Sequence, residues 1–156
     1  MAADRVEREV LIEAPIHVVW EVITKPEHVV GWFSDAAELD LRPGGAGVLT
    51  FNVKATDQGA TYHLRFEAVE PPRRLAYRWV HPVDEKPRAG NSTLVEFILS
   101  EEGAGTRLRV VETGIQLMPW PEAEKEEFAD SHGKGWAHYL ERLGAYASAA
   151  ANRPVP

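Results

Sequence analysis

The sequence predicts an α+β fold in which an antiparallel sheet of six to seven strands is covered on one face by a long C-terminal helix. Several short segments carry an apolar residue at every second position and follow one another with only turns between them, as sequential antiparallel strands do. Near the end of the chain the apolar spacing changes to three and four residues, the period of a helix with one buried face. The predicted order is a strand, two short helices, six strands and the long helix.

Alternation and prolines predict the first strand and the two short helices. Apolar residues alternate mainly with glutamates over 6–12, and Arg8 is the one charged residue on the apolar face. Pro15 opens a helix, because a proline in the first turn loses no helical hydrogen bond. Pro26 ends that helix and begins one more short helical turn, which leads into Trp32.

Alternation also predicts the six strands that follow, beginning with a short one at 35–41. The glycines at 44–47 are typical of a turn that lets a sheet curve, and the polar segment 81–90 is predicted to be a loop. The residues expected on the inward face are Leu49, Phe51, Val53, Tyr62, Leu64, Phe66, Ala68, Leu75, Tyr77, Trp79, His81, Val95, Phe97, Leu99, Leu108, Val110 and Glu112.

The long helix is predicted at 131–149. Gly133 and Gly135 near its start weaken a helix but allow another surface to approach closely. The tail 150–156 consists mostly of small residues and prolines and is expected to fray. The apolar face of the helix is expected to contain Phe128, His132, Trp136, Tyr139, Leu140, Leu143 and Ala147.

Length and charge limit the classes of function. The 156 residues suit one domain over 1–156, with a core at about 5–149. A formal net charge of -7 argues against binding to nucleic acid or to an anionic membrane surface. The lack of cysteine excludes disulfides and cysteine-ligated metals. The chain shows no signal-peptide pattern and no apolar run long enough to cross a membrane, so a cytoplasmic protein is expected.

Short motifs along the chain resemble those of a known protein family. In order they are EAP at 13–15, VW at 19–20, GWF at 31–33, DLRPGG at 40–45, PPRRL at 71–75, GTRL at 105–108 and GW at 135–136. Together they resemble the START-like helix-grip superfamily (SRPBCC) over roughly 6–146. Within it they are most similar to the branch named after activators of the heat-shock chaperone ATPase.

The resemblance implies a curved antiparallel sheet that grips the C-terminal helix, with a cavity between them. It does not imply one activity, because the superfamily resembles a container that is reused for lipids, polyketides, hormones and aromatic substrates. The name of the branch adds a chaperone as a possible protein partner.

The first candidate site is a lining of large apolar side chains between sheet and helix. Two interpretations stay open: the rings pack on each other as a filled core, or they line a cavity that holds a small ligand beside a few polar groups. The candidate ligand-binding residues are Trp32, Phe51, Val53, Phe66, Trp79, His81, Phe97, Val110, Glu112, Trp136 and Leu140.

Two charged residues, Arg8 and Glu112, interrupt apolar strand faces. The resemblance implies that the first and last strands pair, and a register with Ile12 opposite Leu108 places Arg8 opposite Glu112. Since a buried charge needs a partner, we expect an ion pair between them. The pair is either a structural salt bridge near a strand end or a group that orients the polar head of a ligand.

His81 and Glu112 are the candidate catalytic residues. His81 ends a strand on the aromatic face, and both residues are expected at one rim of the pocket, where they could perform acid–base chemistry. The alternative is a rim histidine without chemistry. No cofactor is expected, and no metal site, because His132 and His138 are six residues apart and do not share a helix face at ligand spacing.

These observations favour the binding of a small hydrophobic or aromatic molecule between sheet and helix. One alternative is a cyclase- or hydrolase-like enzyme that uses His81 and Glu112. Another is a co-chaperone or regulatory module that binds a protein partner through a surface that includes Trp120.

Overall fold

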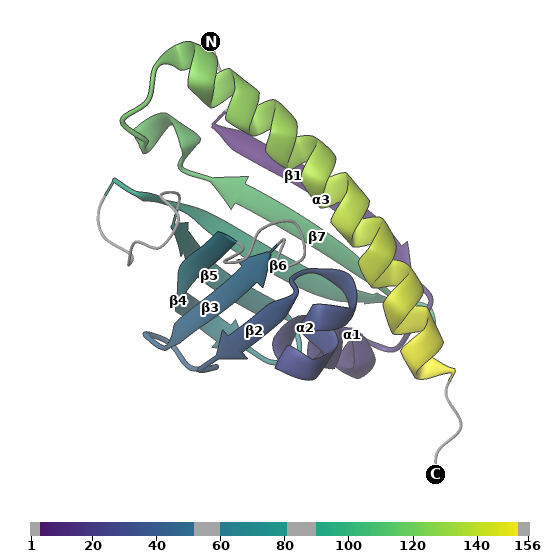
Figure 1. The fold of residues 1–156 in the computed structure, drawn as a ribbon. Helices are drawn as coiled ribbons and strands as arrows, with labels where there is room; N and C mark the ends of the chain where they lie inside the picture. The colour runs from purple at the N-terminus through teal and green to yellow at the C-terminus, as the bar shows by residue number, and fades with distance from the viewer. Residues whose placement is uncertain (1–3, 52–59, 81–89, 153–156) are drawn as a thin grey trace.

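The computed structural model describes residues 4–51, 60–80 and 90–152. Within these ranges seven strands form one antiparallel sheet, in the order β1-β7-β6-β5-β4-β3-β2. This is the predicted α+β helix-grip architecture (Figure 1). In chain order the elements are β1 (Arg5–Ile12), α1 (Ile16–Thr24), α2 (Pro26–Trp32), β2 (Ala36–Leu39), β3 (Ala46–Phe51), β4 (Ala60–Glu70), β5 (Arg74–Val80), β6 (Ser92–Glu102), β7 (Gly105–Thr113), the 3₁₀ turn η1 (Ile115–Leu117) and α3 (Glu122–Ala151).

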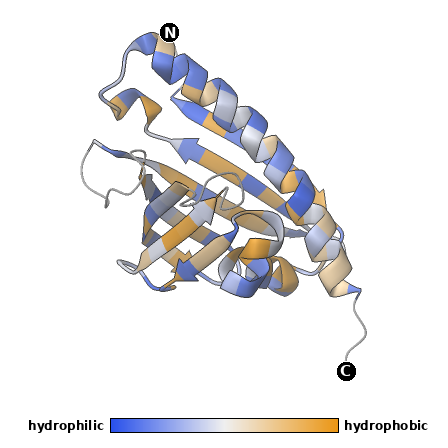
Figure 2. Ribbon diagram, viewed as in Figure 1, coloured by the Kyte–Doolittle hydropathy of each residue, from blue (hydrophilic) through white to orange (hydrophobic). Residues whose placement is uncertain are grey.

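Helix α3 runs along the β1 edge of the sheet, and α1 and α2 lie beside its C-terminal part (Figure 1). Along the strands hydrophilic and hydrophobic residues alternate (Figure 2), as the predicted half-buried sheet requires. The interior therefore has two parts. Helices α1 and α2 cover one end of the sheet, and the middle of α3 covers the other.

Helix α3 is longer than predicted at both ends. It begins at Glu122 instead of residue 131, with Pro121 in extended conformation as the residue before its first turn. Glu122 and Glu124 lie in that first turn, where the positive end of the helix dipole favours acidic residues. At the other end the helix continues to Ala151, two residues past the predicted end.

The predicted register of the first and last strands was also wrong. Val6 is opposite Glu112, and Arg8 is opposite Val110, two residues away from the expected partner. A shift of two residues leaves every side chain on the same face of the sheet. The apolar pattern therefore fits both registers equally well and cannot distinguish between them.

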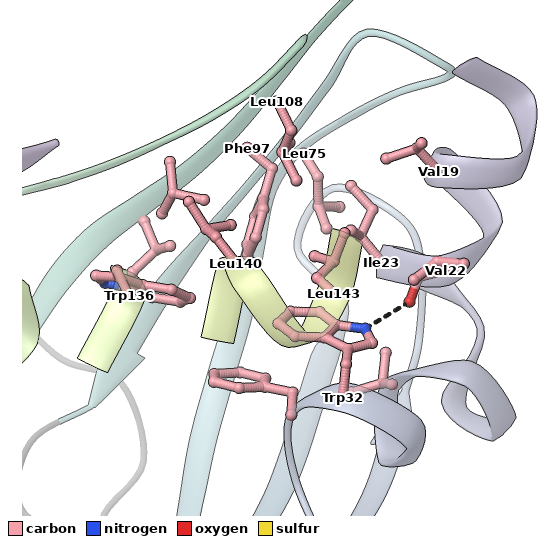
Figure 3. Close-up of a cluster of buried hydrophobic side chains, with 14 of the residues drawn as sticks. Val19, Val22, Ile23, Trp32, Leu75, Phe97, Leu108, Trp136, Leu140 and Leu143 are labelled. Atoms are coloured by element: carbon pink, nitrogen blue, oxygen red, sulfur yellow. Dashed lines mark hydrogen bonds between the residues drawn. The ribbon is translucent and has the colours of Figure 1, made fainter. Parts of the chain in front are cut away.

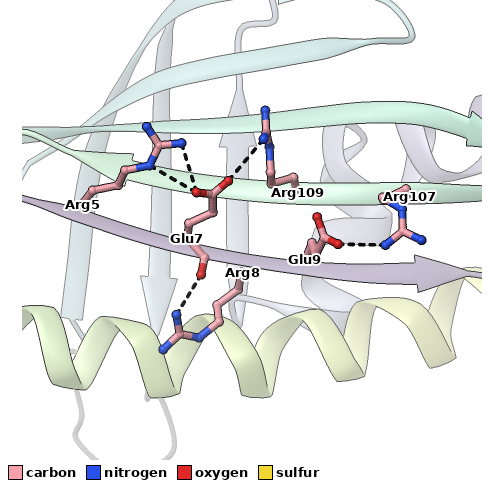
Figure 4. Close-up of polar contacts among 6 residues, drawn as sticks. All are labelled: Arg5, Glu7, Arg8, Glu9, Arg107 and Arg109. Atoms are coloured by element: carbon pink, nitrogen blue, oxygen red, sulfur yellow. Dashed lines mark hydrogen bonds and ion pairs between the residues drawn. The ribbon is translucent and has the colours of Figure 1, made fainter.

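Arg8 makes no ion pair with Glu112 in this register. Its side chain is exposed and reaches over α3 at the edge of the sheet (Figure 4), where its guanidinium donates to the backbone oxygen of Glu7 at 2.7 Å. Gly133 on α3 leaves room for it, since a Cβ there would lie 2.6 Å from the Arg8 Nη2 atom. Glu7 and Glu9 of β1 pair with arginines of β7, and Arg5 pairs with Glu7; such exposed pairs add little stability (Figure 4).

A dense apolar cluster fills the part of the interior beside α1 and α2. Trp32 ends α2 inside this cluster, and its indole Nε1–H donates to the backbone oxygen of Val22 on α1 at 2.9 Å (Figure 3). This bond joins the two short helices and satisfies a buried donor. The labelled members of the cluster are Val19, Val22, Ile23, Trp32, Leu75, Phe97, Leu108, Trp136, Leu140 and Leu143 (Figure 3).

Some predictions fall on residues that the structure does not describe. Val53, His81 and the loop at 81–89 lie outside the described residues. Within 4–51, 60–80 and 90–152, no helix has the length and apolar character needed to span a membrane. The same ranges contain no group of three or more His, Asp or Glu residues placed to hold a metal ion.

Candidate functional site

A cavity of about 180 Å³ lies between the sheet and the middle of α3. Tyr62 of β4 and Trp79 of β5 form its wall on the sheet side, and Phe33, directly after α2, closes one end. We call it the outer cavity. The residues that line it are Phe33, Tyr62, Trp79, Ser131, His132, Gly135, Trp136 and Tyr139.

The size of the outer cavity limits what can occupy it. Apolar cavities of roughly 150 Å³ hold benzene, whereas pockets for drug-sized ligands measure roughly 300–1,000 Å³. At about 180 Å³ the outer cavity fits one aromatic ring with small substituents. Rings also form most of its walls, and they favour stacked or edge-on contacts with an aromatic guest.

A buried carboxylate lies behind the lining. Glu112 on β7 has no exposed surface, and a buried charge of this kind requires several hydrogen bonds. Thr93 on β6 donates its hydroxyl to Oε2 at 2.6 Å, and Trp136 on α3 donates its indole Nε1–H to Oε1 at 3.0 Å. His132 on α3 lies with Nδ1 2.7 Å from the same Oε1. Three side chains from two elements, β6 and α3, therefore converge on one carboxyl group of β7.

His132 connects this carboxylate to the outer cavity. Nδ1 of the His132 ring faces the carboxyl group of Glu112, and Nε2 lies on the opposite edge of the ring, away from Glu112. The ring stacks on Phe128, with centroids 3.7 Å apart. The His132 side chain keeps 21% of its surface exposed and lines the cavity. This arrangement suits a ligand that brings a hydroxyl group to the His132 end.

Two tyrosines keep their phenolic protons at neutral pH. Burial raises the pKa of Tyr62, which lines the outer cavity, and the neighbouring Tyr139 raises it further. Burial raises the pKa of Tyr77 well above its usual value, with an additional contribution from the charge of Glu112. The hydroxyl of Tyr62 is therefore a neutral hydrogen-bond donor at the cavity wall.

A second space lies deeper in the interior and is almost completely filled. It measures about 20 Å³, and we call it the inner space. At this size it holds little more than one water molecule. The residues that line it are Ile23, Val29, Trp32, Phe33, Leu39, Leu49, Leu64, Phe66, Leu75, Tyr77 and Phe97.

The structure divides the predicted ligand-binding residues into groups. Trp79 and Trp136 line the outer cavity, as the cavity interpretation requires. Phe51 packs edge-on against Phe33 and stacks on Trp79 from behind. Glu112 acts through His132. The remaining described residues belong to the packed interior; they are Trp32, Phe66, Phe97, Val110 and Leu140.

Sequence reasoning missed several residues of the outer cavity. His132 was placed on the apolar face of the helix but not at the site, although a histidine four residues before Trp136 and an inward-facing Glu112 were visible signals. Phe33 belongs to one of the recognised motifs, yet nothing in its spacing indicates that it closes a cavity. Tyr62 was expected to point inward, and it does.

Trp120, the residue predicted to form an exposed contact, is only partly exposed. Trp120 is partly buried and packs against Phe128, with ring centroids 5.0 Å apart. The exposed apolar residue in this region is Leu117, in the turn η1, with 78% of its surface accessible. A lone exposed leucine is normal on a protein surface.

Comparison with known proteins agrees with this geometry. The family model described as activator of Hsp90 ATPase homolog 1-like protein matches residues 13–148. A search of curated proteins found no significant match. Among solved structures, CalU16 from Micromonospora echinospora is 31% identical, with a TM-score of 0.67, over 92% of this chain and 76% of CalU16.

Two further structures extend the comparison. DynU16, a protein of the dynemicin biosynthetic locus, is 25% identical with a TM-score of 0.74 over 96% of this chain, and the chain spans only 49% of the length of DynU16. The Aha1 dimer from Colwellia psychrerythraea is 15% identical, with a TM-score of 0.73 over 92% of this chain and 96% of that one, and shows the shared fold alone. Because the family model covers most of the sequence, this chain belongs to the family of activator of Hsp90 ATPase homolog 1-like proteins.

Proposed function

We propose that the protein binds a small aromatic molecule in the outer cavity. The observation that carries the proposal is a hollow of about 180 Å³ with walls made mainly of aromatic rings. A pocket that is mostly apolar with a few placed polar groups is the usual form of a small-molecule site. The similarity to DynU16, a protein of a biosynthetic locus, supports a small molecule as the partner.

The polar groups suggest which aromatic molecules bind best. His132 is oriented by Glu112 at one end of the cavity, and Tyr62 offers a neutral hydroxyl at the wall. A ring that carries one hydroxyl group can stack between the aromatic walls and hydrogen-bond to His132. One such hydrogen bond contributes about 0.5–1.5 kcal/mol, so a phenol should bind roughly 3–10-fold more tightly than the same ring without the hydroxyl.

Thermal shift with matched ligands tests the proposal. At a concentration of about 100 times its Kd, 4-methylphenol should stabilise the protein by about 2.7 kcal/mol, which raises Tm by roughly 5–11 °C for a chain of this size. 1,4-Dimethylbenzene should bind more weakly, and His132→Leu should remove the difference. The control is His17→Leu, the same change at an exposed position on α1. Unchanged Tm with both compounds at millimolar concentration would rule the proposal out.

A second candidate function is acid–base catalysis on the bound molecule. The observation that favours it is the 2.7 Å contact between Nδ1 of His132 and the buried carboxylate of Glu112. A histidine oriented in this way can remove a proton from carbon next to a carbonyl group and return one from solvent. The test is deuterium incorporation into the methyl group of acetophenone in heavy water. Incorporation at the buffer rate, or equal rates with His132→Leu, would exclude this function.

Other expectations stay predictions. A chaperone partner is consistent with the family at a coarse level, but the surface expected for it included Trp120, which packs against Phe128. A cytoplasmic location likewise stays a prediction from the sequence.

A further inference from the structure

One side chain borders both the outer cavity and the inner space. Among the described residues, Phe33 alone lines both. Phe33 follows the last residue of α2, where the backbone has left the helical conformation, and its side chain is 8% exposed. Phe33 therefore stands between the two spaces, together with the contacts of Phe97 with Trp136 and of Tyr77 with Trp79.

Aromatic rings hold Phe33 in place from several sides. It stacks on Trp32, with ring centroids 4.8 Å apart, and on Trp136, with centroids 5.5 Å apart. The edge-on contacts with Trp79 and Tyr139 come from the outer cavity. Residues that line the outer cavity and residues that line the inner space therefore both contact the Phe33 ring.

The inner space differs in chemistry from the outer cavity. The polar side-chain groups of its lining residues are the Tyr77 hydroxyl and the Trp32 indole N–H, which is bonded to Val22. The outer cavity contains His132, Ser131 and two tyrosines. A group that passes from the outer cavity into the inner space must be hydrocarbon, because no set of polar partners would replace its lost hydration. The inner space alone is too small for an alkyl chain, but removal of the Phe33 ring would add the volume of that ring beside its hydrocarbon walls.

We propose that Phe33 sets the maximum length of the ligand. With Phe33 in place, the site takes a compact hydroxylated ring and rejects the same ring with an alkyl tail directed toward the interior. A smaller residue at position 33 joins the two spaces and converts the site to one for alkylated phenols. This proposal rests on the proposed binding of an aromatic molecule.

Contacts between α2 and α3 hold Phe33 in position. Gly31 lies directly against the ring of Tyr146 on α3, so closely that a Cβ at position 31 would overlap it. The imidazole Nδ1 of His28 lies 2.8 Å from the Tyr146 hydroxyl. These contacts hold the end of α2 against α3, two residues before Phe33.

The experiment measures the Kd of phenol, 4-ethylphenol, 4-butylphenol and 4-hexylphenol by tryptophan fluorescence. The wild type should bind phenol and 4-ethylphenol and lose at least tenfold in affinity at 4-butylphenol. In Phe33→Ala the order should reverse, since each buried methylene adds about fourfold in affinity. If Phe33→Ala does not fold, the same measurements are made on Phe33→Leu. The matched control is Phe97→Leu, which enlarges the inner space and leaves Phe33 in place, and should keep the wild-type order.

The possible outcomes separate the two proposals. Suppose that the wild type binds phenol and that a folded Phe33 variant shows the same dependence of affinity on alkyl-chain length. This result would overturn the role of Phe33 and leave the binding function standing. Wild type that binds 4-hexylphenol as tightly as phenol would do the same. No binding of any member of the series by wild type or variants would overturn both.

Discussion

Replacement of Glu112 should separate the role of its shape from the role of its hydrogen bonds. In Glu112→Ala the hydroxyl of Thr93, the indole N–H of Trp136 and Nδ1 of His132 all lose their acceptor. An unsatisfied buried group costs about 1–3 kcal/mol, and removal of one partner from a buried charged network costs about 3–5 kcal/mol. We expect a loss of about 3–5 kcal/mol, because Thr93 and Trp136 both lose a buried acceptor. His132 adds little to this loss, because it is partly exposed and can turn to water.

Glu112→Gln should cost much less, within about 1 kcal/mol. The amide oxygen can occupy the position of Oε1 and accept from Trp136 and His132, and the amide nitrogen can donate to the Thr93 hydroxyl, which then serves as acceptor. Urea denaturation followed by circular dichroism measures both changes. For a chain of this size the alanine variant should melt roughly 6–20 °C lower. Equal losses for both variants, or a loss under 1 kcal/mol for alanine, would refute the network.

Three further predictions concern stability. Burial raises the pKa of Tyr77 above the value of 10.0 that it has when unfolded. Above pH 10 the unfolded state therefore releases a proton that the folded state keeps, and the free energy of unfolding should fall by about 1.4 kcal/mol per pH unit. Tyr77→Phe should make this slope smaller in alkaline denaturation. Gly31→Ala should lower the free energy of unfolding by about 1–3 kcal/mol, because the added Cβ overlaps the Tyr146 ring. Tyr146→Leu in the same chain should restore part of the lost free energy, as measured by urea titration. A double variant as unstable as Gly31→Ala would contradict the overlap as the cause. Residues 1–156 as one domain should unfold in a single transition with equal calorimetric and van't Hoff enthalpies, and two transitions would contradict it.

The fold could be predicted from the sequence because its main determinants are local. Alternation defined the strands and their inward faces, and Pro15 and Pro26 marked the starts of α1 and α2. The start of α3 was missed because the segment from Glu122 to Asp130 is mostly polar and lacks a strong apolar period. Here Pro121 and the acidic first turn determine the boundary.

The candidate site was less predictable because it depends on relations between distant elements. A register two residues from the expected one moves Arg8 away from Glu112 without changing which face either residue occupies. The partner of Glu112 is instead His132, and that contact depends on how α3 lies across β7. The alternation of strands indicated that rings meet beneath the helix. It could not indicate that the interior has a filled part and a hollow one, or that Phe33 borders both.

The most direct test of the binding site is an NMR measurement of contacts between protein and ligand. With 4-methylphenol at saturating concentration, nuclear Overhauser effects should join the ring protons of the ligand to indole protons of Trp79 and Trp136, which line the outer cavity. Overhauser effects confined to exposed residues such as Leu117, or none to either tryptophan, would contradict binding in the outer cavity.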